Sequence, residues 1–194
     1  MISCRCRHFN GDSGAGDVNF MEATRPKALF LDRDGIINED TAYPYLPAQI
    51  HFNETVFSLC KKAMELGYLL IVITNQAGVA KGKFTEQDVK ALHEWMGDEL
   101  KKRGIEIERF YYCPHHVEGS VPEYKKTCNC RKPKPGMVEQ AVKDFGIDIS
   151  SSLVVGDKKS DRIQIEGLRS IIVKSKYVES GYDVEDLSKV AEYL

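Results

Sequence analysis

The sequence predicts an α/β domain with a doubly wound, mostly parallel sheet. Short apolar runs alternate with longer amphipathic segments from residue 27 onward, and no internal repeat is found. The run over residues 68–74 (YLLIVIT) is almost entirely apolar, as strands buried on both faces are. In such sheets ligands bind beyond the carboxyl ends of the strands, so the residues that follow each strand are candidates for a functional site.

Each predicted helix carries its own start or stop signal. Asn53 is a suitable N-cap, Thr85 with Asp88 forms a capping box, and Gly67 and Gly146 each follow the last residue of an amphipathic run. The predicted helices span residues 54–66, 86–103, 136–145 and 184–194. The predicted strands span residues 28–31, 68–74, 107–112, 153–155 and 171–174.

The composition narrows the class of protein. The chain has 194 residues, a formal net charge of −2 and 42% hydrophobic residues, so we expect one soluble domain with a sizeable core. The balanced charge disfavours a nucleic-acid partner, and no apolar run is long enough for a membrane span. Residues 1–20 lack a periodic apolar pattern and are interpreted as a disordered extension ahead of a single domain over residues 21–194. We expect a cytoplasmic monomer.

Six cysteines are the unusual feature of the composition. Cys4 and Cys6 lie in the extension with His8, where a flexible tail is favoured over a metal site because no fourth ligand is near. Cys60 lies on the apolar face of the predicted helix 54–66 and is interpreted as a core residue.

The other three cysteines form a ligand pattern with a histidine. Cys113, His115, Cys128 and Cys130 are spaced C-x-H-x12-C-x-C, two tight pairs that are typical of a closed, structural zinc site. The alternatives are two disulfides or four unligated groups, and a reducing compartment disfavours the disulfides. A zinc ion would order a loop that has little apolar content of its own.

Acidic, hydroxyl and cationic side chains follow the predicted strands. Asp32 and Asp34 lie two apart in extended chain and so share a face, and Gly35 lets the backbone turn. The other polar residues at strand ends or in a proline-rich loop are Thr74, Asn75, Gln76, Arg131, Lys132, Lys134, Asp157, Lys158 and Asp161. Each alone could be a cap or a solvated turn, but together they indicate a site for phosphate and a divalent cation.

Four of these segments, LFLDRDG, VITNQ, RKP and VVGDK, resemble the motifs of the haloacid-dehalogenase-like phosphatases over roughly residues 22–175. Residues 76–84 (QAGVAKGKF) and 111–137 are similar to members that release the 7-phosphate of a heptose bisphosphate, and slightly less to those that act on histidinol phosphate. The resemblance implies a Mg²⁺-dependent phosphatase that forms an aspartyl-phosphate, without a large cap domain, in the synthesis of nucleotide-activated heptose for lipopolysaccharide. The implied partner is a small phosphorylated sugar.

The resemblance also implies catalytic roles. Asp32 is the expected nucleophile and Asp34 the expected acid and base. The expected Mg²⁺ ligands are the carboxylates of Asp32 and Asp157 and the backbone carbonyl of Asp34. Thr74 would bind phosphoryl oxygens, and Lys132, in preference to Lys134, would balance their charge.

Further residues are expected to bind the substrate or support the metal. Arg131 can bind a substrate phosphate with two hydrogen bonds, and Lys158 would lie near both metal and phosphate. Asp161 is expected behind the ligands, and His115 is preferred to His116 as the zinc ligand because of the family spacing. The remaining expected substrate contacts are Asp40, Tyr43, Asn75 and Gln76.

Three functions follow from the sequence, in order of preference. Hydrolysis of heptose bisphosphate comes first and hydrolysis of histidinol phosphate second. A zinc-stapled nucleic-acid-binding module is third, because the basic loop over residues 113–135 has few aromatic residues and no predicted recognition helix. Residues 162–166 (RIQIE) depart from the family pattern, which puts a helix at that point in doubt.

Overall fold

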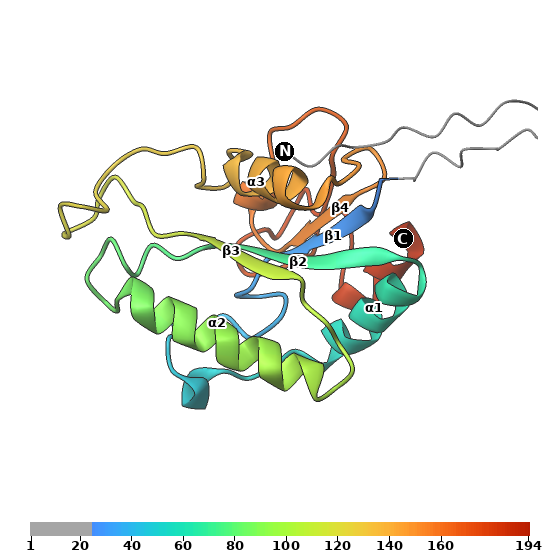
Figure 1. Ribbon diagram of the computed structural model, residues 1–194, viewed down its shortest axis with the longest axis horizontal. Coiled ribbons are helices and arrows are strands. Elements are labelled where there is room, and N and C mark those ends of the chain that lie inside the picture. The colour runs from blue at the N-terminus through green and yellow to red at the C-terminus, as the bar shows by residue number, and fades with distance from the viewer. Residues whose placement is uncertain (1–24) are drawn as a thin grey trace, which may run out of the picture.

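The computed structural model describes residues 25–194 (Figure 1). Five strands in this range form one parallel sheet in the order β3-β2-β1-β4-β5. The strands are β1 (Lys27–Leu31), β2 (Tyr68–Asn75), β3 (Arg109–Cys113), β4 (Leu153–Gly156) and β5 (Arg169–Ile172). Because all four neighbouring pairs are parallel, every strand ends at the same edge of the sheet. The proposed extension over residues 1–20, with Cys4, Cys6 and His8, lies outside the described residues.

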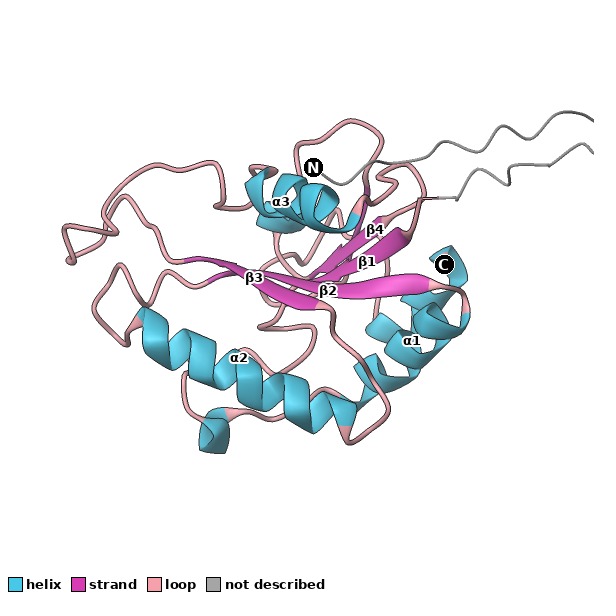
Figure 2. Ribbon diagram, viewed as in Figure 1, coloured by secondary structure: helices cyan, strands magenta, loops and turns pink. Residues whose placement is uncertain are grey.

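Helices cover both faces of the sheet, which confirms the doubly wound fold class. In Figure 2, α1 (Glu54–Glu65) and α2 (Glu86–Lys101) lie on one side of the strands and α3 (Gly136–Phe145) on the other. Alternate residues of β1 pack on opposite faces of the sheet. Leu29 and Leu31 belong to the core cluster that includes α1 and α2, and Phe30 belongs to the cluster that includes α3. Within residues 25–194, no helix is long and apolar enough to cross a membrane.

The expected caps at Asn53, Thr85 and Gly146 are confirmed, whereas α2 ends at Lys101, two residues before its predicted end. The Asn53 side chain accepts a hydrogen bond from the Thr55 amide at the start of α1, and Thr85 with Asp88 forms the capping box of α2. Gly146 has a φ of 67° at the C-cap of α3, a left-handed conformation that glycine adopts without strain.

The prediction of a helix over residues 184–194 is wrong in type and length. The segment forms a 3-10 helix, η3 (Leu187–Tyr193), which packs beside α1. Its buried residues, Leu187 and Val190, are three apart, and a helix with three residues per turn places such residues on one face. The strand predicted at residues 171–174 also begins two residues earlier, at Arg169.

The chain passes from β4 to β5 with only a short 3-10 turn, η2 (Lys159–Asp161), and residues 162–168 contain no helix. Ile163 and Ile165 pack against the cluster around α3. The Ile165 amide donates to the Ile163 carbonyl at 3.0 Å, which closes a three-residue turn in place of a helix at the point where residues 162–166 depart from the family pattern.

Candidate active site

A pocket of about 330 Å³ lies beyond the carboxyl edge of the sheet. Ten of the expected site residues line it: Asp32, Asp34, Asp40, Tyr43, Thr74, Asn75, Gln76, Arg131, Lys132 and Lys158. Three further lining residues are not among those expected from the sequence: Ala42, Ser160 and Tyr177. Tyr177 follows β5, so the rule that places ligands beyond strand ends was the one signal that could have found it.

The floor of the pocket is a buried ion-pair cluster. The Lys132 ammonium lies 2.9 Å from Asp32 Oδ1 and 2.6 Å from Asp161 Oδ1, and it donates to the Ile73 carbonyl at 2.9 Å. Burial disfavours the charged lysine, but the two carboxylates outweigh that effect and raise the pKa of Lys132 above its ordinary value. The pocket floor therefore presents a carboxylate whose neighbour is a permanent cation.

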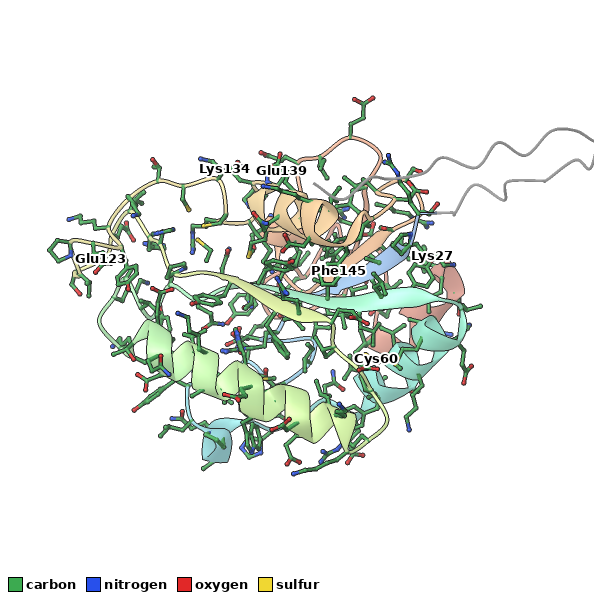
Figure 3. All side chains as sticks on the ribbon, viewed as in Figure 1. Lys27, Cys60, Glu123, Lys134, Glu139 and Phe145 are labelled. Atoms are coloured by element: carbon green, nitrogen blue, oxygen red, sulfur yellow. The ribbon has the colours of Figure 1, made fainter. Side chains whose placement is uncertain are left out.

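Lys134 takes no part in this cluster. Its side chain is exposed and stands at the outer surface near the start of α3 (Figure 3), whereas Lys132 is 4% exposed. The Asn75 side chain explains the difference, because it accepts a hydrogen bond from the Lys132 amide at 3.0 Å and donates to the Lys132 carbonyl at 3.2 Å. Asn75 thus holds the backbone that points Lys132 inward.

A second group of oxygen atoms surrounds the Lys158 ammonium. It lies 3.2 Å from Asp157 Oδ1, 3.0 Å from the Asp34 carbonyl oxygen and 3.9 Å from Asp32 Oδ2. Asp157 Oδ1 is buried, and the Lys158 ammonium is the charged group beside it. Gly35 is required beside it, since a Cβ there would fall 2.2 Å from Asp157 Oδ2. These hard oxygen donors suit a divalent cation such as Mg²⁺.

Electrostatics in this group favour bound cations. Burial raises the pKa of Asp157 to about 6, and the nearby charges of Asp32 and Asp161 add to the rise while Lys158 opposes it. Within residues 25–194, the side-chain carboxylates of Asp32, Asp157 and Asp161 lie close enough to hold a metal ion together. Asp161 also pairs with Lys132, which occupies one side of its carboxylate.

The Asp34 carboxylate faces the pocket and accepts hydrogen bonds from three side chains. Arg33 donates from Nε to Oδ1 at 3.1 Å and from Nη2 to Oδ2 at 3.0 Å. Asn38 donates to Oδ1 at 3.1 Å, and Gln76 donates to Oδ2 at 2.9 Å. Gln76 also donates to Thr74 Oγ1, whose own hydroxyl proton stays available to a ligand.

The rim of the pocket is cationic and aromatic. Arg131 donates to the His115 carbonyl at 3.3 Å, so the cysteine-containing loop holds it over the pocket. Asp40 accepts from Lys158 at 3.0 Å, and Tyr43 accepts from Lys81 at 2.9 Å. These contacts give the pocket mouth several donors for an anionic substrate.

The expected zinc ligands come together where β3 ends. The ligand atoms of Cys113, His115, Cys128 and Cys130 all lie within 4.8 Å of one another, and neighbouring atoms are 3.3 to 3.8 Å apart. A zinc tetrahedron with Zn–S bonds of ~2.3 Å has edges of about 3.8 Å, whereas a disulfide requires ~2.05 Å. All four thiols in residues 25–194 are free, so the structure favours a metal site over disulfides.

Comparisons with known proteins agree with this geometry. Residues 38–183 match the family described as polynucleotide kinase 3 phosphatase. The chain is 45% identical over 141 residues to the D-glycero-alpha-D-manno-heptose-1,7-bisphosphate 7-phosphatase of Photorhabdus laumondii, covering 73% of this chain and 77% of that protein. It is 42% identical over 169 residues to the D-glycero-beta-D-manno-heptose-1,7-bisphosphate 7-phosphatase of Pasteurella multocida, covering 87% of this chain and 90% of that protein.

A solved structure shows the same likeness. The D,D-heptose 1,7-bisphosphate phosphatase of B. bronchiseptica, complexed with magnesium and phosphate, superposes with a TM-score of 0.71 at 27% identity, covering 86% of this chain and 97% of that one. The described sheet, the acidic strand ends and these relatives agree with the motifs in the sequence. The chain therefore belongs to the haloacid-dehalogenase-like phosphatases, in the polynucleotide kinase 3 phosphatase family.

Proposed function

We propose that this protein removes the 7-phosphate of D-glycero-D-manno-heptose 1,7-bisphosphate. The observation that supports this most is the buried Asp32 carboxylate, which faces the pocket between Lys132 and the Asp157 carboxylate. The relatives named for this reaction share 42–45% of their residues with this chain over the aligned segments. The pocket volume lies near the lower end of the range for small-molecule sites, which suits a single sugar.

The reaction follows from the positions of the two acids. An Asp32 carboxylate oxygen attacks the C7 phosphorus, the bond from phosphorus to the sugar oxygen breaks, and Asp34 gives a proton to that oxygen. Water, deprotonated by Asp34, then attacks the phosphorus of the aspartyl-phosphate and releases inorganic phosphate. Lys132 stabilises the negative charge on Asp32 and on the phosphoryl group during both steps.

The oxygen donors described above would hold Mg²⁺ through Asp32, Asp157 and the Asp34 carbonyl. The bound ion would reduce the repulsion between the carboxylate nucleophile and the phosphate dianion. Zn²⁺ would be held by Cys113, His115, Cys128 and Cys130 and would order the loop that ends in Arg131.

The substrate assignment is tested by a parallel assay. The full chain, supplied with Mg²⁺, is given both anomers of heptose 1,7-bisphosphate, histidinol phosphate and a 3′-phosphorylated oligonucleotide. We expect a heptose anomer to have the highest kcat/KM, with ³¹P NMR showing loss of the C7 phosphate and retention of the C1 phosphate. Faster turnover of histidinol phosphate or of the oligonucleotide would overturn the assignment.

A further inference from the structure

Arg33 is the largest fully buried side chain among residues 25–194, although it stands between two pocket carboxylates. Buried arginines are rare because the charge must be desolvated, so a complete set of partners is expected. Arg33 has such a set of partners. Asp34 accepts two hydrogen bonds from the guanidinium, the Pro44 carbonyl accepts one from Nη2 at 3.1 Å, and His93 Nε2 lies 3.3 Å from Nη1. Each guanidinium nitrogen is therefore held in place.

His93 comes from the middle of α2, sixty positions along the chain from Arg33. His93 is 5% exposed, and its ring stacks on Phe110 with centroids 4.8 Å apart and lies edge-to-face with Tyr112 with centroids 5.7 Å apart. Burial and the Arg33 charge lower the pKa of His93 to about 3, so the ring is neutral and Nε2 can accept a hydrogen bond. The aromatic contacts fix the ring, and the ring limits where the guanidinium can lie.

We propose that Arg33 and His93 are positioning residues for Asp34: His93 fixes the Arg33 guanidinium, and the guanidinium fixes the Asp34 carboxylate toward the substrate. This inference rests on the phosphatase function proposed above. The Asp34 side chain is 17% exposed while that of Arg33 is 1% exposed, so the cation holds the carboxylate from the protein side. Asn38 and the pocket-lining Gln76 contact the same carboxylate, and Arg33 is the one charged partner among these three donors. Neither Arg33 nor His93 touches the pocket.

A positioning role for Asp34 predicts a dependence on the leaving group. A sugar oxygen must be protonated as it departs, whereas 4-nitrophenolate leaves without a proton. A displaced Asp34 should therefore slow hydrolysis of the sugar phosphate and leave the rate of hydrolysis of 4-nitrophenyl phosphate unchanged. The comparison uses kcat/KM, which covers the steps up to the departure of the leaving group and is insensitive to the later hydrolysis of the aspartyl-phosphate.

The test uses His93→Leu, which keeps apolar volume but removes the acceptor, and His93→Gln, which restores one. For His93→Leu we expect kcat/KM for the sugar phosphate to fall about 10- to 100-fold, in line with the cost of misplacing a catalytic group, and kcat/KM for 4-nitrophenyl phosphate to stay within about threefold. His93→Gln should recover most of the loss. Arg33→Lys should show the same selective loss, because lysine cannot reproduce the two-point contact with Asp34.

Controls separate this inference from general damage and from the proposed function. Met96→Leu alters a buried residue of the same helix, and kcat/KM for both substrates should stay at the wild-type value. Inhibition by inorganic phosphate should be equal in all variants, since the phosphate contacts are intact. Equal losses on both substrates, or no loss in His93→Leu, would overturn the positioning role. A wild-type chain that hydrolyses no phosphomonoester would instead overturn the proposed function.

Discussion

Replacing Lys132 by methionine should damage both stability and catalysis, because it removes the cation from between two buried carboxylates. Asp32 is 4% exposed and Asp161 is fully buried, and each lies within 3 Å of the Lys132 ammonium. Breaking a buried ion pair by removing one partner costs about 3–5 kcal/mol. For a chain of this length, 1 kcal/mol corresponds to roughly 2–4 °C, so the melting temperature should fall by about 6–20 °C.

The catalytic loss should be separable from the loss of stability. Removing one preorganised electrostatic contact from an active site typically costs ~10²–10³ in rate, and we expect kcat for Lys132→Met to fall by that amount. Adding Asp161→Asn removes one of the two unpaired charges while keeping an acceptor for the Lys158 amide, which donates to Asp161 at 2.9 Å. The double variant should regain several degrees of melting temperature but no activity.

Lys134→Met is the matched control, since this lysine is exposed and two residues away. Surface substitutions usually change stability by less than about 0.5 kcal/mol, so Lys134→Met should melt and turn over like the wild type. Thermal unfolding followed by circular dichroism and steady-state phosphate release at saturating Mg²⁺ measure the two effects. A Lys132→Met protein that retains wild-type turnover, or a Lys134→Met protein that loses it, would refute the reasoning.

Three further results are expected. Asp32→Asn should abolish phosphate release while the protein stays folded, and no phosphorylated enzyme should be recovered after an acid quench. Turnover by this variant at the wild-type rate would contradict the nucleophile assignment. Elemental analysis should find about one zinc per chain, lost in Cys130→Ser but kept in Cys60→Ala, whose thiol is buried in the core; a zinc-free folded wild type would contradict the site. Because the pKa of His93 is about 3 in the folded protein and 6.5 in its ordinary state, the unfolded chain binds the extra proton between these values and stability falls as pH drops. Between pH 7 and pH 5 this amounts to roughly 2 kcal/mol, so urea unfolding of His93→Leu should show a smaller pH dependence by about that amount, and equal slopes would contradict it.

Much of the fold follows from local chemistry. Asn53, Thr85 and Gly146 mark helix ends with hydrogen bonds or backbone conformations that depend on near neighbours alone. The terminal segment differs from its prediction because an apolar spacing of three fits two helix types, and the segment that packs beside α1 is the tighter 3-10 helix.

Part of the candidate site also follows from local sequence. Asp32 and Asp34 follow β1 and both line the pocket, although Arg33 between them lies in a turn and not in the expected extended chain. Parallel strands bring their carboxyl ends to one edge of the sheet, so the gathering of polar groups was predictable from the strand order. The zinc quartet was predictable because its two pairs are tight in sequence.

Other features depend on contacts between residues distant along the chain. Two lysines in RKPKP have nearly the same local sequence, and the pair of hydrogen bonds between Asn75 and the Lys132 backbone, 57 residues apart along the chain, turns Lys132 inward. Likewise, α2 brings His93 against Arg33, and the loop after β5 brings Tyr177 to the pocket. Spacing rules describe residues within one element, whereas burial and ion pairing arise only when separate elements pack together. The sequence alone thus identifies the residues that carry the chemistry, and the packed fold assigns each one its neighbours.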